Sequence, residues 1–192
     1  MFKQSIIITA LLIAGTVQST FAQDNITPQR KHAIDSLAIE KVRDLSKYIS
    51  IIGDKATSFS EASRVIKRAE ELFEPGSKLG VSSLESKDVN YFTVDKYFQR
   101  LMALNYLKVK IDWYNVHYIS DLEKQPDGKY VGVVTIYQRF EGFGGEGLKY
   151  TDVTKKDVTI YVEKKQTQIN GMTIDFWDVI LGDIKVSETK KV

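Results

Sequence analysis

The sequence contains no cysteine, and it has only two histidines among its 192 residues. Without cysteine the chain can form no disulfide, and no lipid can be attached to a cysteine behind a leader sequence. Thiolate and imidazole groups are the usual ligands of zinc, so their scarcity argues against a transition-metal site. We therefore expect a fold held by its hydrophobic core alone, with no metal and no cofactor.

An excess of charge of one sign is also missing. The 27 Lys and Arg residues are opposed by 25 Asp and Glu residues, and the two signs are interspersed along the chain. Proteins that bind nucleic acid use a basic surface, which this composition does not supply. We expect no nucleic-acid partner.

The sequence supports neither a dinucleotide-binding motif nor the serine motif of many hydrolases. Gly142, Gly144 and Gly147 have the spacing G-x-G-x-x-G, but a dinucleotide site needs that loop to open a helix. Here the chain passes from strand to strand, and Glu141 and Glu146 accompany the glycines. We interpret the segment as a hairpin loop. A serine on a G-x-S-x-G elbow is absent too, which removes that route to nucleophilic catalysis.

The first residues have the pattern of an export signal. Lys3 supplies a positive charge, residues 6–17 are almost wholly apolar, and Thr20-Phe21-Ala22 offers small residues for cleavage. The apolar run is shorter than the ~20 residues of a membrane-spanning helix. We predict a signal peptide at 1–22 and a polar leader at 23–29. The protein would be exported, to the periplasm or outside the cell, with no membrane span after cleavage.

Apolar residues at three- and four-residue steps predict three helices. The first runs from Pro28 to Gly53, and the second starts at the capping sequence Ser58-Phe59-Ser60-Glu61. Residues 79–84 are expected to form a short edge strand or extended segment. The third helix starts near Thr93 and ends before Asn105.

Four longer strands follow, and the rest of the chain is organised around them. Residues 107–113 alternate between apolar and polar side chains, as in a strand with one buried face. Further strands are predicted at 129–140, 157–165 and 172–186. The segments between them carry turn residues, namely Pro126-Asp127-Gly128, the glycines of 142–147, and Asn170-Gly171.

This order predicts a single α+β domain at 30–188, followed by a tail at 189–192. Its N-terminal helices would pack on a curved antiparallel sheet of four to five strands. With Tyr97-Phe98 on the third helix and the 179–186 run closing the last strand, the chain resembles the nuclear transport factor 2-like family of cone-shaped domains. A cystatin-like arrangement, with one helix wrapped by the sheet, is the alternative.

The resemblance implies where catalytic groups would lie. Enzymes of that family use carboxylate, tyrosine or histidine side chains that project into the cone, but no motif here allows a residue-by-residue assignment. We assign no catalytic residue. The candidates are His117, close to an expected bulge or strand end, and Asp112, Asp175 or Asp178 as a carboxylate that could orient it. A structural role for His117 at a strand end is the alternative. The alternation places Ile111, Trp113 and Ile160 on the inner face, where they would line a core or an apolar pocket.

The opposite face of the sheet carries tyrosines. Tyr114, Tyr137, Arg139 and Tyr161 alternate out of register with the aliphatic residues, and tyrosine and arginine are enriched at protein interfaces. A homodimer through this outer face, or another protein partner, is one expectation, and an ordinary solvated face is the other. The sequence favours a non-catalytic binding module for a protein or a small apolar ligand. The alternative is a lyase or isomerase acting on a small apolar substrate in the cone.

Overall fold

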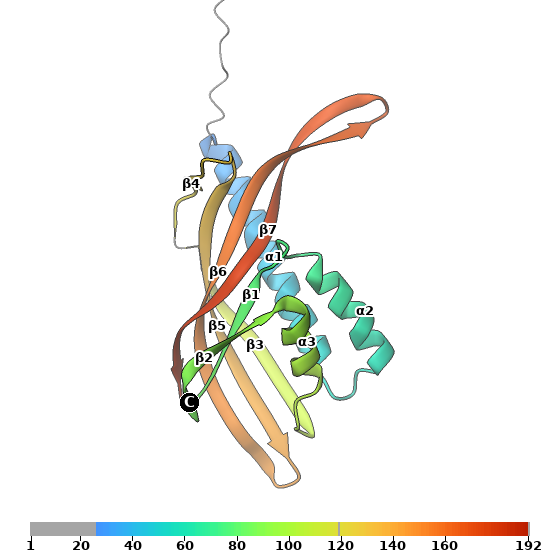
Figure 1. Ribbon diagram of the computed structural model, residues 1–192, viewed down its shortest axis with the longest axis vertical. Coiled ribbons are helices and arrows are strands. Elements are labelled where there is room, and N and C mark those ends of the chain that lie inside the picture. Colours follow the sequence, from blue (N-terminus) through green and yellow to red (C-terminus); the bar gives the residue numbers. More distant parts are fainter. Residues whose placement is uncertain (1–25, 119, 192) are drawn as a thin grey trace, which may run out of the picture.

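The computed structural model describes residues 26–118 and 120–191. The predicted signal peptide lies outside the described residues, as does most of the leader. Three helices pack against one face of a single curved sheet (Figure 1). None of the helices in these two ranges is both long enough and apolar enough to cross a membrane.

The helices form where the apolar periodicity predicts them. Helix α1 (Pro28–Gly53) is capped by Thr27, whose hydroxyl accepts a hydrogen bond from the Arg30 backbone N–H at 3.3 Å. Helix α2 (Phe59–Glu70) is capped by Ser58, as predicted. Helix α3 is Val94–Met102, and it buries Tyr97 and Phe98. Since α1 begins at Pro28, its first residues belong to the segment expected to be a leader.

Seven strands form the sheet, in the spatial order β2-β1-β7-β6-β5-β3, with the short β4 paired to β5. The predicted α+β class, with helices on a curved and largely antiparallel sheet, is confirmed. The sheet has more strands than the four to five expected, and its β1–β7 pair is parallel. The strands are β1 (Lys78–Ser83), β2 (Ser86–Thr93), β3 (Lys108–Tyr118), β4 (Glu123–Lys124), β5 (Tyr130–Gly144), β6 (Gly147–Ile169) and β7 (Met172–Lys190).

The segment expected as an edge strand lies inside the sheet. Strand β1 is bordered by β2 on one side and by β7 on the other. The prediction missed β2 because its side chains are mostly polar and it is the outermost strand, where pairing on one side suffices. At the other end, β7 continues to Lys190, so residues expected to form the tail belong to the sheet.

Strand β6 is much longer than predicted. It spans 23 residues, from Gly147 to Ile169, where the expected strand covered only 157–165. Its first part is polar, but backbone hydrogen bonds to β5, and from Val153 onward to β7 as well, hold it as a strand whatever its side chains. This additional length positions the candidate site described below.

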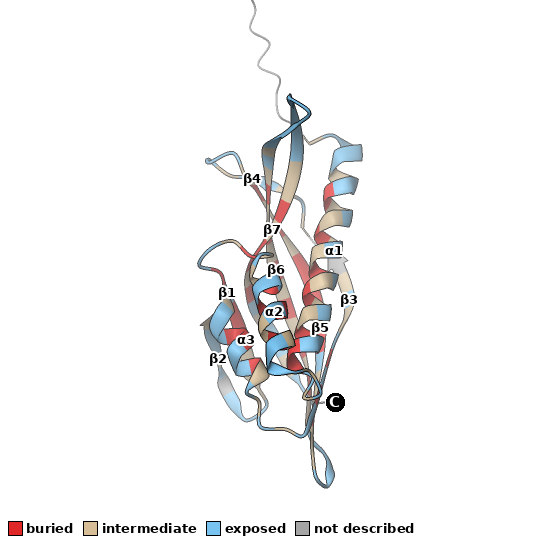
Figure 2. Cartoon of the chain, turned by 90° about the vertical axis from the view of Figure 1, so that its right-hand side faces the viewer, coloured by how far each residue is buried: buried red, intermediate tan, exposed pale blue. Residues whose placement is uncertain are grey.

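The core lies between the helices and the concave face of the sheet, where buried residues concentrate in Figure 2. Both hairpin ends that project from the body are largely exposed (Figures 1 and 2). The β6–β7 turn is Asn170-Gly171, and both residues have positive φ, 51° and 79°, as in a two-residue type I′ turn. A register shift between Tyr114 and His117 shows that β3 has a bulge there, one of the two irregularities expected near His117.

Candidate functional site

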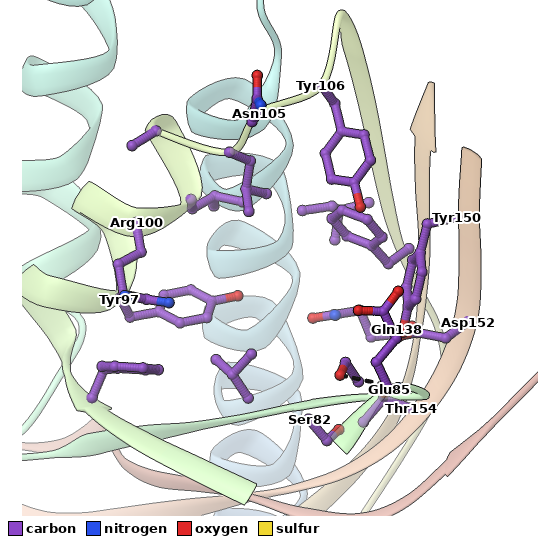
Figure 3. Close-up of a pocket in the computed structure, with 18 of the residues that line it drawn as sticks. Ser82, Glu85, Tyr97, Arg100, Asn105, Tyr106, Gln138, Tyr150, Asp152 and Thr154 are labelled. Carbon is purple, nitrogen blue, oxygen red and sulfur yellow. Dashed lines mark hydrogen bonds between the residues drawn. The ribbon is translucent and has the colours of Figure 1, made fainter. Parts of the chain in front are cut away.

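A cavity of about 460 Å³ lies between α3, the β1–β2 hairpin and the sheet (Figure 3). Helix α3 stands away from the sheet here, and the hairpin crosses below it. Phe92, Leu101, Ile111 and Phe140 contribute apolar wall. Val81, Ala103 and Leu104 are also apolar, and much of the polar wall comes from the first part of β6.

Three successive inward-facing residues of β6 line the cavity. Asp152, Thr154 and Lys156 are 4%, 2% and 3% exposed, and their spacing of two puts them on one face of the strand. The same face continues into the apolar core through Val158 and Ile160. The strand therefore changes from a packed hydrophobic face to a polar wall at the point where the helices no longer cover it.

Asp152 is a buried carboxylate with one satisfied oxygen. The Tyr150 hydroxyl donates a hydrogen bond to its Oδ2 at 2.7 Å, and the Leu84 backbone N–H donates to the Tyr150 oxygen at 2.9 Å. The other oxygen, Oδ1, is buried and has no hydrogen-bond partner among the described residues. Burial raises the pKa of Asp152, while the Tyr150 hydrogen bond and the Lys156 charge oppose that rise. Burial and the bond to Asp152 raise the pKa of Tyr150 to about 12.

Lys156 lies on the same wall. Its Nζ donates to the Gly80 carbonyl oxygen at 3.3 Å and lies 5.9 Å from the centroid of the Tyr97 ring. Burial lowers the pKa of Lys156 to about 8, against the smaller effect of Asp152, which raises it. The side chain is therefore an amine that changes charge close to neutral pH.

The opposite walls add further polar groups. In Figure 3, Tyr97 of α3 and Gln138 of β5 point toward one another across the cavity, and Tyr106 and Arg100 lie at its rim. Burial raises the pKa of Tyr97, so its hydroxyl remains a hydrogen-bond donor. The Gln138 Oε1 accepts a hydrogen bond from the Trp113 indole N–H at 3.1 Å, which holds the amide in place.

Of the three residues predicted to line a ligand pocket, one lines the cavity and two do not. Ile111 lines the cavity. Ile160 is fully buried in the core beyond the polar wall, and Trp113 is half-buried and reaches the cavity only through its bond to Gln138.

The predicted catalytic residues do not assemble. Asp112 is exposed and pairs across the strands with Arg139, away from the cavity. Asp175 is exposed near the β6–β7 turn, where its carboxylate lies 3.0 Å from the Lys164 amine. The His117 backbone pairs with Thr135, but its side chain lies outside what the structure describes. Asp112 and Asp175 lie on β3 and β7, which β5 and β6 separate in the sheet.

Three of the four predicted partner residues come together on the outer face. The Tyr114 and Tyr137 rings stack with centroids 5.9 Å apart, and the Arg139 guanidinium lies 5.6 Å from the Tyr114 centroid. Tyr161 is about 20 Å away, because it lies six residues along β6 from the partner of Tyr137. Its ring covers Gly182, where an added Cβ would meet Tyr161 Cε2 at 2.5 Å.

Sequence reasoning missed Tyr150, Asp152 and Lys156. The sequence gives little signal for them, because polar residues occupy the inward positions of β6 at Asp152, Thr154 and Lys156. They hide the period of two that is plain from Val158 onward. Among the described residues, no three acidic or histidine side chains lie close enough together to hold a metal ion.

Comparisons with known proteins add little to this description. No protein-family model matches the sequence, and no curated protein matches it either. Among solved structures, the chain is similar to "Putative Scytalone Dehydratase" from Novosphingobium aromaticivorans, with 9% identity and a TM-score of 0.44 over 84% of this chain and 90% of that one. A similarity of this size carries no argument about activity, and the proposals below rest on the cavity itself.

Proposed function

We propose that this protein binds a small organic molecule in the cavity between α3, the β1–β2 hairpin and β6. The observation that supports this proposal is a buried oxygen atom, Asp152 Oδ1, which has no hydrogen-bond partner in the described part of the chain. Asp152 is one of the residues that line the cavity. A buried polar group without a partner costs about 1–3 kcal/mol, which a ligand donor would recover. The cavity volume of about 460 Å³ is in the usual range for ligands of this kind.

The walls define the chemistry of the ligand. Phe92, Leu101 and Phe140 offer an apolar surface for a ring or a short hydrocarbon. Asp152 would accept a hydrogen bond from a hydroxyl or amine group, and the Lys156 amine can donate to an oxygen. The ligand is therefore a compact molecule with an apolar body and a polar end that both donates and accepts.

A binding experiment with a matched pair of variants tests this proposal. Aromatic alcohols, phenols and benzylamines would be screened by thermal shift, and the hits titrated against the wild type, Asp152→Asn and Asp112→Asn. We expect Asp152→Asn to weaken binding by about tenfold, equivalent to ~1.4 kcal/mol, because it removes a charged acceptor. Asp112→Asn should bind as the wild type does, since Asp112 is exposed on the other side of the sheet. Equal affinities for the three proteins, or no hit at all, would contradict the proposal.

Proton transfer on a bound substrate is a second candidate function, of the lyase or isomerase class. It is favoured by one observation: burial raises the pKa of Asp152, and one carboxylate oxygen is left without a partner. A general base works best when its pKa approaches the operating pH. The readout is exchange of the α-protons of a bound ketone in D₂O, followed by NMR. Exchange that disappears in Asp152→Asn supports catalysis, and binding without exchange leaves the protein as a binding protein.

A further inference from the structure

We infer that Lys156 is a carbonyl-reactive amine, which forms a reversible imine with an aldehyde or ketone held in the cavity. The inference rests on the binding function proposed above and names the chemical class of its ligand. It is carried by the position of Lys156 on the cavity wall, by its sparse hydrogen bonding and by the balance of charges around it.

The surroundings of Lys156 do little to stabilise the charged form of its amine. An ammonium group has three donors, yet Nζ makes a single hydrogen bond, to the Gly80 carbonyl, within the described residues. No carboxylate of those residues lies within ion-pair distance of it. The surroundings therefore favour the neutral amine, and the lowered pKa of Lys156 agrees with this geometry. A desolvated lysine of this kind is the usual nucleophile in imine formation.

The charges around Lys156 favour a neutral carbonyl compound over an anion. The titratable and charged groups that line the same cavity come from α3, from the β1–β2 turn, from the segment before β3 and from β6. They are Tyr97, Arg100, Glu85, Tyr106, Tyr150 and Asp152. With Lys156 as the neutral amine, Glu85 and Asp152 outnumber Arg100, so the wall has no net positive charge to hold a carboxylate or phosphate. An aldehyde or ketone is neutral, so its binding does not require a positively charged wall.

The reaction balances with groups already in the cavity. The neutral Nζ attacks the carbonyl carbon, a C–N bond forms as the C=O π bond breaks, and a proton moves from nitrogen to oxygen to give a carbinolamine. A proton from solvent in the cavity then moves to the hydroxyl group of the carbinolamine. The C–O bond breaks, water leaves, and the nitrogen lone pair forms the C=N bond of an iminium ion on the same wall as the Asp152 carboxylate. Hydrolysis reverses each step.

Reductive trapping tests the inference, with benzaldehyde as the probe. The mature protein would be incubated at pH 7 with benzaldehyde and cyanoborohydride, and the modified lysines would be located by peptide mass. The matched control lies within the same chain, because Lys155 is the next residue of β6 and faces the other side of the sheet. We expect Lys156 to be benzylated at least about tenfold faster than Lys155, since burial favours the neutral, nucleophilic form of the Lys156 amine. Lys156→Met should lose the fast adduct, and Lys155→Met should keep it.

The outcomes separate this inference from the proposed function. Benzaldehyde binding would be measured without reductant by saturation-transfer NMR. Binding with Lys156 labelled no faster than Lys155 overturns the imine and leaves the cavity as a binding site. No binding of benzaldehyde overturns the imine as well, and the proposed function falls with it only if the alcohol, phenol and amine probes also fail. Labelling in the wild-type protein answers the question even where Lys156→Met does not fold.

Discussion

Replacing Lys156 by methionine should change how stability depends on pH. In the folded protein burial lowers the pKa of Lys156 to about 8, whereas its ordinary value is 10.5. Between these two pH values the unfolded chain binds more protons than the folded one, so the free energy of unfolding rises with pH. Below pH 8 the folded state carries the full cost of a buried charge. At about 1.4 kcal/mol for each pH unit, that cost is ~3 kcal/mol.

Methionine fills a similar volume and carries no charge, so it should remove this cost. We expect the free energy of unfolding of Lys156→Met, minus that of the wild type, to be largest at pH 7. The difference should shrink by ~3 kcal/mol as the pH approaches 10.5, where the wild-type amine is neutral in both states. The measurement is urea denaturation of both proteins at several pH values. Groups that titrate alike in the two proteins cancel in the difference.

Lys155→Met provides the matched control, because Lys155 faces the other side of the sheet and is not among the residues that line the cavity. Parallel pH profiles for the wild type and Lys156→Met would refute the reasoning. They would mean that the Lys156 amine is as well solvated in the folded protein as in the unfolded chain. The cavity wall would then not lower its pKa.

Three further predictions follow from the faces of the sheet and from the N-terminus. Ile160→Ala should lower the free energy of unfolding by about 2–5 kcal/mol, because Ile160 is fully buried. Thr159→Ala on the opposite face should cost far less, and equal urea midpoints would contradict this assignment. If the outer face forms a homodimer, Tyr114→Lys should convert dimer to monomer in light scattering, and a monomeric wild type would exclude it. The exported protein should begin at Gln23 by intact mass, and a species that retains Met1 would rule out the cleavage.

Much of the fold could be predicted from local pattern. Helices α1 and α2 begin where capping residues precede an apolar stripe, and the turn at Asn170-Gly171 uses the residues that tolerate positive φ. These features depend on a few neighbouring residues, so they can be recognised in the sequence. Strand β2 could not be recognised in this way. Its polar residues form a strand because β1 offers a backbone ladder, which is a property of the sheet.

Part of the candidate site could likewise be predicted from the sequence, and the rest depends on the tertiary structure. The alternation of Val158, Ile160 and Val162 determines by itself that these residues share a face of β6, because the period of a strand is two residues. Since the inward-facing residues before Val158 are polar, it does not determine that the strand continues back through Lys156 and Asp152. It does not determine whether that face meets packed side chains or an open cavity. Only the placement of α3 and the β1–β2 hairpin decides this, since these elements enclose a cavity over the first part of β6. The pKa values of Asp152 and Lys156 depend on that burial, so the chemistry of the site belongs to the tertiary structure.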